Sequence, residues 1–264
     1  MSDTIKLEID GAIATITLNR PDRMNAFTWE MIDAWAAALE ECQRNDAIAV
    51  VIVTGAGKAF CSGGDIAEMQ KRSASERTPL DRKTELQGHV HKIPLTLEAL
   101  DKPVIAAING AATGAGLDLA LMMDLRIAAA SARLGETYVK VGLVPGAGGA
   151  WFLPRLVGTA KALELFWTGE LVDAGEAERI GIVNKVVPDA ELMTATNLLA
   201  EKIAAAPPLS VRFIKRAVYQ GQRTDLRSAL DLISSHYAVV STSADHREAV
   251  NAYLEKRKPK FTGR

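Results

Sequence analysis

Two glycine-rich loops, each following a buried strand, are the parts of this sequence best suited to chemistry. The first follows the apolar run 48–54 and covers 55–65; the second follows the apolar run 103–108 and covers 109–116. Small residues in such loops let another backbone or a ligand come close. Two loops of this kind could direct two backbone N–H groups at one oxygen atom, as an enolate or a tetrahedral oxyanion requires. The pattern therefore favours a site that stabilises a developing negative charge.

Three side chains that can move protons follow the second loop: Asp118, Glu136 and Tyr138. Asp118 lies in the first turn of a predicted apolar helix, where it can serve as a base. Tyrosine, whose ordinary pKa is about 10, is better suited to donate a proton or to hold a water molecule. If 135–138 is extended, Glu136 and Tyr138 point to the same face, and Glu136 also reaches the pocket.

Each of these side chains also has a purely structural interpretation. An acidic residue such as Asp118 is favourable in the first turn of any helix. Tyr138 can pack in the core or in a pocket wall. Glu136 can form a surface or interface salt bridge. The sequence leaves these alternatives open.

The remaining segments predict an α/β fold that positions the loops. Alternation over 4–18 predicts a hairpin, and an apolar stripe over 28–44 predicts a helix that starts at Thr28. The strand 48–54 follows that helix, and a strand–helix–strand crossover implies a parallel sheet. From Trp151 onward the pattern is helical with short interruptions.

The stretch between the two loops is the least regular part of the sequence. Residues 68–79 are polar and contain helix breakers, which predicts a mobile loop at the border of the site. His89 and His91 follow on a segment that is expected to cover the pocket. Either could replace a missing acid or base, because histidine titrates near neutral pH, although a solvated or core histidine is the more common role.

Composition excludes several classes of function. The chain has 264 residues, of which 48% are hydrophobic and 24% charged, with a net charge of −1. Such a balance gives no field that would attract nucleic acid or an anionic membrane. No apolar run approaches the roughly 20 residues that span a bilayer. The two cysteines, Cys42 and Cys61, indicate neither a disulfide framework nor a metal site, so we expect a cytoplasmic protein.

Five short motifs, in this order along the chain, resemble those of the crotonase superfamily of enoyl-CoA hydratases and isomerases. They are Leu18-Asn19-Arg20-Pro21 with Asn25-Ala26, then 59–66, 103–110, 142–149 and 154–158. The resemblance runs from about residue 5 to the end of the chain. It implies a spiral of ββα units (1–200) that carries the acyl-CoA site, and a C-terminal helical region for trimerisation (201–264). It also implies homotrimers, often paired into hexamers.

The resemblance also assigns roles to the catalytic candidates. It places the two oxyanion donors at the backbone N–H groups of Gly64 and Ala115. Enoyl-CoA hydratases carry a glutamate at each of the positions held here by Asp118 and Tyr138. Addition of water needs a base and a second group as acid, whereas double-bond isomerisation needs only one base. We therefore expect an enolate-forming acyl-CoA enzyme in fatty-acid or related acyl-CoA degradation, which isomerises a double bond or hydrates a specialised substrate.

Contacts to coenzyme A follow from the same resemblance, because the chain has no phosphate-binding loop of the usual kind. The residues at the matching positions are Arg23, Met24, Ala26, Ser62, Gly63, Asp65, Ile66 and Lys256. Coenzyme A is part of the substrate, and we expect no further cofactor and no metal.

Two alternatives within the family stay open. The chain can be a carbon–carbon hydrolase, or a member that binds acyl-CoA or RNA without catalysis. The near-neutral charge argues against RNA. No serine stands in the context of a nucleophile with a paired histidine, which makes a serine protease of the related spiral fold remote.

Overall fold

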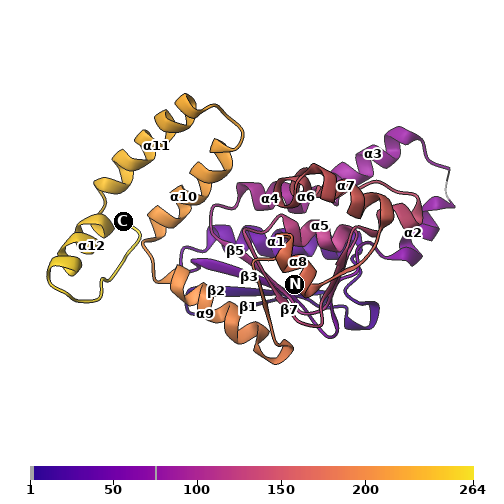
Figure 1. Cartoon of the computed structure of the whole chain (residues 1–264), viewed down its shortest axis with the longest axis horizontal. Helices are drawn as coiled ribbons and strands as arrows, with labels where there is room; N and C mark the ends of the chain where they lie inside the picture. Colours follow the sequence, from indigo (N-terminus) through magenta and orange to yellow (C-terminus); the bar gives the residue numbers. More distant parts are fainter. Residues whose placement is uncertain (1–2, 75) are drawn as a thin grey trace.

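The computed structural model describes residues 3–74 and 76–264, whose strands form two sheets (Figure 1). The order in the larger sheet is β1-β2-β3-β5-β7-β10, and in the smaller one β4-β6-β8-β9. The strands are β1 (Ile5–Asp10), β2 (Ile13–Leu18), β3 (Val50–Gly55), β4 (Ala59–Cys61), β5 (Val104–Ile108), β6 (Ala111–Thr113), β7 (Leu125–Ala129), β8 (Arg133–Gly135), β9 (Val172–Asp173) and β10 (Lys185–Val187).

Helices cover the sheets and make up most of the chain after β8. The α-helices are α1 (Trp29–Arg44), α2 (Ile66–Ser73), α3 (Pro79–Gly88), α4 (Lys92–Ala99), α5 (Ala115–Leu121), α6 (Gly149–Val157), α7 (Thr159–Thr168), α8 (Ala174–Arg179), α9 (Leu192–Ala204), α10 (Pro208–Gly221), α11 (Leu226–Ser241) and α12 (Ala244–Leu254). Three short 3₁₀ helices are η1 (Pro21–Arg23), η2 (Thr137–Val141) and η3 (Asp189–Glu191).

The predicted spiral of ββα units is confirmed. The pairs β3/β4, β5/β6 and β7/β8 each give one strand to the larger sheet and the next to the smaller sheet. Helical segments then follow: α2 after β4, α5 after β6, and η2 with α6 after β8. The strands β3, β5 and β7 are parallel and carry fully buried Val, Ile and Ala side chains, as expected for a sheet that is covered on both faces.

The two N-terminal elements also agree with the sequence. The hairpin of β1 and β2 is antiparallel, with Ile5 opposite Leu18 and Asp10 opposite Ile13. Helix α1 begins after Thr28, whose side chain accepts a hydrogen bond from the N–H of Met31 and so caps the helix. The apolar stripe of α1 lies in the core beneath the sheet.

The prediction of a loop over 68–79 is wrong for residues 68–73, because residues 66–73 form helix α2. The side chain of Asp65 accepts hydrogen bonds from the N–H groups of Ala67 and Glu68 and starts this helix. An N-cap of this kind outweighs a polar composition, since it satisfies donors that would otherwise lack partners.

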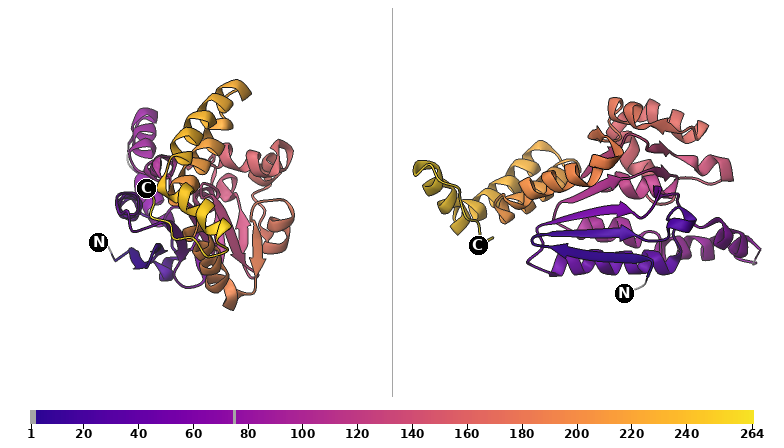
Figure 2. Two further views of the ribbon diagram at one scale, coloured as in Figure 1. Left: turned by 90° about the vertical axis from the view of Figure 1, so that its left-hand side faces the viewer. Right: turned by 90° about the horizontal axis from the view of Figure 1, so that it is seen from below.

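The C-terminal helices divide into two sets. Helix α9 packs its buried face, including Leu192 and Ala200, against the larger sheet. Helices α10, α11 and α12 instead extend away from the sheets as an arm (Figures 1 and 2). A division at residue 200, as predicted, stays a prediction; in the structure the arm begins at Pro208, after α9.

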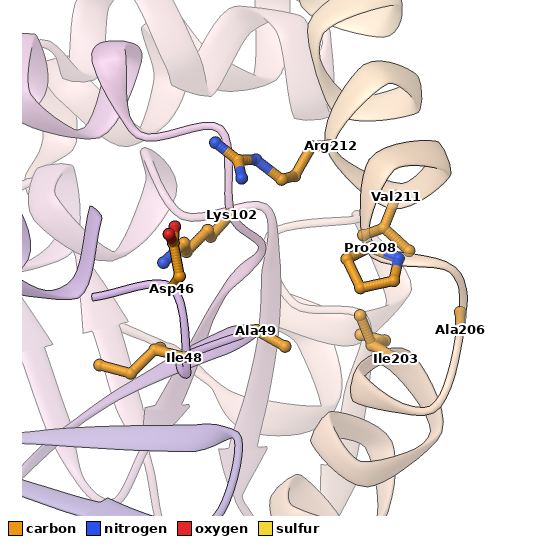
Figure 3. A pocket seen from close by; sticks show the side chains of 9 residues that line it. All are labelled: Asp46, Ile48, Ala49, Lys102, Ile203, Ala206, Pro208, Val211 and Arg212. Carbon is orange, nitrogen blue, oxygen red and sulfur yellow. The ribbon is translucent and has the colours of Figure 1, made fainter. Parts of the chain in front are cut away.

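A small cavity of about 60 Å³ marks the junction of the arm with the sheets. Figure 3 shows Lys102 and Asp46 on the side of the sheets, and Pro208 and Arg212 on the side of α10. The buried Lys102 amine donates to the carbonyl oxygens of Cys42 and Asn45, each at 2.7 Å, and caps the end of α1. Helix α10 is held here by Arg212 Nε, which donates to Asp101 Oδ1 at 2.8 Å, and by Lys215 Nζ, which donates to the carbonyl oxygen of Lys102 at 2.8 Å.

Of the helices that the structure describes, none is both long enough and apolar enough to cross a membrane.

Candidate active site

The two glycine loops lie against each other at the carboxyl ends of β4 and β6. Thr113 Oγ1 donates to the carbonyl oxygen of Ser62 at 3.2 Å. Gly63 has a φ of +96°, and a Cβ on it would lie only 3.1 Å from Thr113 O, just before α5. Only glycine combines this backbone conformation with this approach. The peptide that leads into Gly64 therefore lies beside the first turn of α5.

Both predicted oxyanion donors have an unused N–H group. Gly64 forms an isolated parallel bridge with Phe27, whose bonds run from Phe27 N to Gly63 O and from Asp65 N to Phe27 O. This pattern leaves the N–H of Gly64 without an acceptor. Ala115 is the first residue of its helix, where an N–H has no acceptor within the helix. Among residues 3–74 and 76–264, no hydrogen bond uses either N–H group.

Gly64, Ala115 and Tyr138 line one pocket, with a volume of about 280 Å³. Its other walls are mainly apolar and come from α1, α2, α3 and the loop before α6. The apolar wall residues are Phe27, Trp29, Met69, Leu86, Val90, Leu143 and Val144. Arg72, Arg82 and Glu85 line its outer part, and the guanidinium of Arg72 stacks on the Trp29 ring. The pocket thus joins a mainly apolar cavity to the two residues whose N–H groups are free.

Asp118 lies directly behind Tyr138 and is fully buried. The hydroxyl of Tyr138 donates to Asp118 Oδ2 at 2.6 Å, and the N–H of Ala147 donates to the same oxygen at 3.1 Å. Gly149 closes the other side, since a Cβ there would lie 1.8 Å from Asp118 Oδ1. Asp118 is not among the residues that line the pocket, so Tyr138 stands between it and the cavity.

Glu136 is also fully buried and does not line the pocket. The predicted extended conformation of 135–138 is wrong: β8 ends at Gly135, and the 3₁₀ helix η2 begins at Thr137. This turn, rather than the alternation of a strand, brings both Glu136 and Tyr138 to Asp118. Glu136 interacts with Asp118, and no donor among the described residues satisfies its two carboxyl oxygens.

Burial controls the protonation of this group of three. It raises the pKa of Asp118 above its usual range, even though the hydrogen bond from Tyr138 acts in the opposite direction. Burial, and then the charge of Asp118, raise the pKa of Glu136 far above that of an ordinary carboxyl. The same two causes raise the pKa of the Tyr138 hydroxyl. Burial thus disfavours the ionised form of both carboxyls.

The residues predicted to bind coenzyme A fall into two sets. Six of them lie together where the segment after η1 runs beside the first glycine loop: Met24, Ala26, Ser62, Gly63, Asp65 and Ile66. Arg23 adjoins this set and is exposed. Lys256 follows α12 at the far end of the arm (Figure 1), and the fold of one chain does not bring it to the others.

Asp65 already has structural partners. Its carboxylate accepts from Arg20 Nη2 at 3.0 Å and caps α2. Burial opposes ionisation, but the bond from Arg20 and those from the α2 backbone outweigh it and lower the pKa of Asp65. Any contribution of Asp65 to coenzyme A binding thus comes through the shape of the loop or through its backbone.

Asn25 is an important residue that the sequence motif contained but did not single out. It is fully buried with a left-handed φ of 54°, and its side-chain amide donates to the carbonyl oxygens of Ala56 and Ala59. Its Oδ1 accepts from the N–H of Arg20. Asn25 therefore fixes the first glycine loop against η1. The sequence did contain a signal for this role, because asparagine adopts the left-handed backbone conformation more readily than most residues.

The two histidines do not line the pocket, although Val90 between them does. The His89 ring stacks on Trp29 with ring centres 4.1 Å apart, and His91 Nε2 forms a hydrogen bond with Gly146 O at 2.9 Å. Both support the pocket wall from behind. In the described part of the chain, no group of three His, Cys, Asp or Glu side chains could hold a metal ion.

Comparison with known proteins places this geometry in a family. Residues 8–264 match the family model for enoyl-CoA hydratase/isomerase. The short-chain-enoyl-CoA hydratase of Clostridium acetobutylicum is 38% identical, over 97% of this chain and 96% of that protein. The 1,2-epoxyphenylacetyl-CoA isomerase of Escherichia coli is 37% identical over the full length of both.

Solved structures agree. The crystal structure of an enoyl-CoA hydratase from Bacillus anthracis superposes with a TM-score of 0.90 at 36% identity, over 99% of this chain and 100% of that one. Fold, site and sequence lead to one conclusion: the chain belongs to the enoyl-CoA hydratase/isomerase family, the crotonase superfamily.

Proposed function

We propose that this protein forms an enolate from an enoyl-CoA thioester and moves its double bond from the β–γ to the α–β position. The observation that carries the proposal is the Tyr138–Asp118 hydrogen bond in the wall of the pocket that also holds the N–H groups of Gly64 and Ala115. These N–H groups bind the thioester carbonyl oxygen, on which negative charge develops. A single proton-transfer group serves both carbons of a double-bond shift.

The proton moves through Tyr138. Its oxygen takes a proton from the α carbon while its own proton passes to Asp118 Oδ2, and the electrons of the broken C–H bond enter the enolate. The same path then runs in reverse and delivers a proton to the γ carbon. No tyrosinate accumulates, in keeping with the raised pKa of the Tyr138 hydroxyl. Asp118 is the acceptor throughout, although Tyr138 stands between it and the substrate.

Incubation with 3-enoyl-CoA and with 2-enoyl-CoA thioesters tests the reaction. The wild-type protein is expected to convert 3-enoyl to 2-enoyl thioester faster than it hydrates the 2-enoyl thioester. Tyr138→Phe removes the hydroxyl and keeps the ring, so the isomerisation rate should fall by about 10²-fold or more. Hydration as the faster reaction, with Tyr138→Phe unimpaired, would instead favour an activity like that of the hydratases among its relatives.

We further propose that the working form is a homotrimer or a pair of trimers. The arm carries apolar side chains that are 41–84% exposed in the single chain. They are Leu226, Leu230, Ile233, Tyr237, Val239, Val250, Tyr253 and Leu254. A neighbouring copy would cover them and could bring its Lys256 to the coenzyme A residues. Light scattering at several protein concentrations measures the mass, and a monomer with full activity would reject this assembly.

The same proposal needs no cofactor beyond the coenzyme A of the substrate and no nucleic acid or membrane as partner. A cytoplasmic location fits the two cysteines, both of which are buried and free. Full activity of protein dialysed against a chelator is the expected result.

A further inference from the structure

The proposed reaction uses Tyr138 and Asp118 but not the third member of their group, Glu136, which lies behind the pocket. Glu136 is 0% exposed, and neither of its carboxyl oxygens accepts a hydrogen bond within the described residues. Asp118 Oδ1 likewise has no donor there, whereas Asp118 Oδ2 has two. Buried polar atoms normally have partners, and each one without a partner requires an explanation.

One proton pairs two of these three oxygens, Asp118 Oδ1 and one carboxyl oxygen of Glu136. Two ionised carboxylates would offer acceptors only, and no cation pairs with either of them in the part of the chain that the structure describes. A protonated carboxyl is also a donor. A proton on Glu136 gives Asp118 Oδ1 its missing donor and removes one buried charge. It also leaves Asp118, which already accepts from Tyr138 and Ala147, as the ionised member.

We infer that Glu136 is held as a neutral carboxylic acid that donates a hydrogen bond to Asp118 Oδ1 and so aims Asp118 Oδ2 at the Tyr138 hydroxyl. Glu136 is thus a positioning residue that never touches the substrate. Its position follows from the fold, because it comes directly after β8 and Gly114 N donates to Gly135 O at 2.8 Å just before α5 begins. The effect on kcat rests on the proposed function, whereas the protonation of Glu136 does not.

Among the described residues, Glu136 is the side chain beside Asp118 Oδ1 that can supply a donor. Asp118 comes from α5 and Tyr138 from η2. The N–H groups of Ala147 and of Gly149, the first residue of α6, face the carboxyl of Asp118 and lower its pKa. Tyr138 and Ala147 both donate to Oδ2. Asp118 Oδ1 makes no hydrogen bond with good geometry to a described donor, and the carboxyl of Glu136 is the neighbouring side chain that can supply one.

Two substitutions of similar size separate a neutral donor from an ionised base. Glu136→Gln keeps an N–H donor toward Asp118 and is expected to retain kcat within about 3-fold of wild type. Glu136→Met keeps the length but donates nothing, and kcat should fall roughly 10-fold to 100-fold with KM unchanged, as for one hydrogen bond to a charged group. Loss of activity in Glu136→Gln equal to that in Glu136→Met would overturn the inference, as would full activity in both.

Infrared difference spectroscopy checks the protonation state without any turnover. The spectrum of wild type minus Glu136→Gln at about pH 8 should contain the carbonyl stretch of a protonated carboxyl, although an ordinary glutamate is ionised there. A carboxylate band in its place would contradict the inference whatever the activity. A protonated band in a protein that turns over no enoyl-CoA would reject the proposed function and leave the inference standing.

Discussion

Two aspartates near opposite ends of α5 each accept a hydrogen bond from a tyrosine, and the two pairs differ in what else surrounds them. Asp118 accepts from Tyr138 at 2.6 Å, with a second carboxyl as neighbour. Asp124 accepts from Tyr219 at 2.8 Å and also from Lys215 Nζ at 2.8 Å. The Tyr138 of the first pair lines the pocket that also holds Gly64 and Ala115, while the second pair, which lines other pockets, ties α10 to the sheets.

The comparison shows that a cation decides the role of such a pair. Lys215 places a positive charge 2.8 Å from the carboxylate of Asp124. The carboxylate therefore stays paired, and the contact serves as a link between α10 and the sheets. Asp118 has no cation among the described residues, so burial raises its pKa and makes it ready to take a proton. The same two residue types thus build a structural contact at one end of α5 and a candidate proton acceptor at the other.

Replacing each aspartate by asparagine should give the largest difference between the two pairs. Asp118→Asn is expected to lower kcat by about 10²–10⁴-fold, the usual contribution of general acid–base catalysis, with little loss of stability. Asp124→Asn leaves Lys215 without its carboxylate and should lower the free energy of unfolding by about 1–3 kcal/mol while kcat per folded protein stays the same. Steady-state kinetics and urea denaturation measure both. Equal kinetic losses would show that the two ends of α5 do not differ in role.

The N–H of Ala115 offers the next largest effect. Proline is tolerated at the first position of a helix but lacks an N–H. Ala115→Pro should therefore lower kcat by about 10²–10³-fold through loss of one oxyanion donor. Ala244→Pro is the matched control, since Ala244 is exposed and begins α12, far from the pocket. Similar activity of the two variants would remove Ala115 from the site.

The pH dependence of stability sharpens the contrast between paired and unpaired acids. Glu136 keeps its proton in the folded chain but loses it in the unfolded chain above about pH 4.3. Its contribution to the free energy of unfolding is therefore largest at acid pH and falls as the pH rises. Glu136→Gln cannot titrate, so its stability relative to wild type should increase with pH by up to about 1.4 kcal/mol per pH unit. Urea denaturation between about pH 5 and 8 measures the slope, and a flat difference would contradict a buried neutral acid.

The smallest effect is expected from the tyrosine of the structural pair. Tyr219→Phe removes one hydrogen bond to Asp124, which keeps its bonds to Lys215 and to the N–H of Val104. The free energy of unfolding should fall by about 1 kcal/mol, with kcat unchanged. Thermal unfolding at one protein concentration checks the first value, and a drop in kcat near that of Tyr138→Phe would mean that the arm acts on the site.

Local sequence signals were enough to predict the strands β3 and β5, the helix α1 and the two glycine loops. The Val- and Ile-rich runs that became β3 and β5 are buried on both faces, and Thr28 marked the start of α1. Such features depend on neighbours along the chain. The helix α2 was missed because one cap at Asp65 outweighed a polar composition over the next residues.

The sequence by itself determined the fold, the order of the loops, and the kinds of proton-carrying residue near them. Only the tertiary structure decided that Tyr138 faces the pocket while Asp118 and Glu136 lie behind it, and that a turn rather than a strand brings them together. It also decided that Lys215 reaches Asp124 and that no comparable cation of the described chain reaches Asp118. The physical reason is that burial and pairing of a charge depend on contacts between distant segments, which no local pattern encodes.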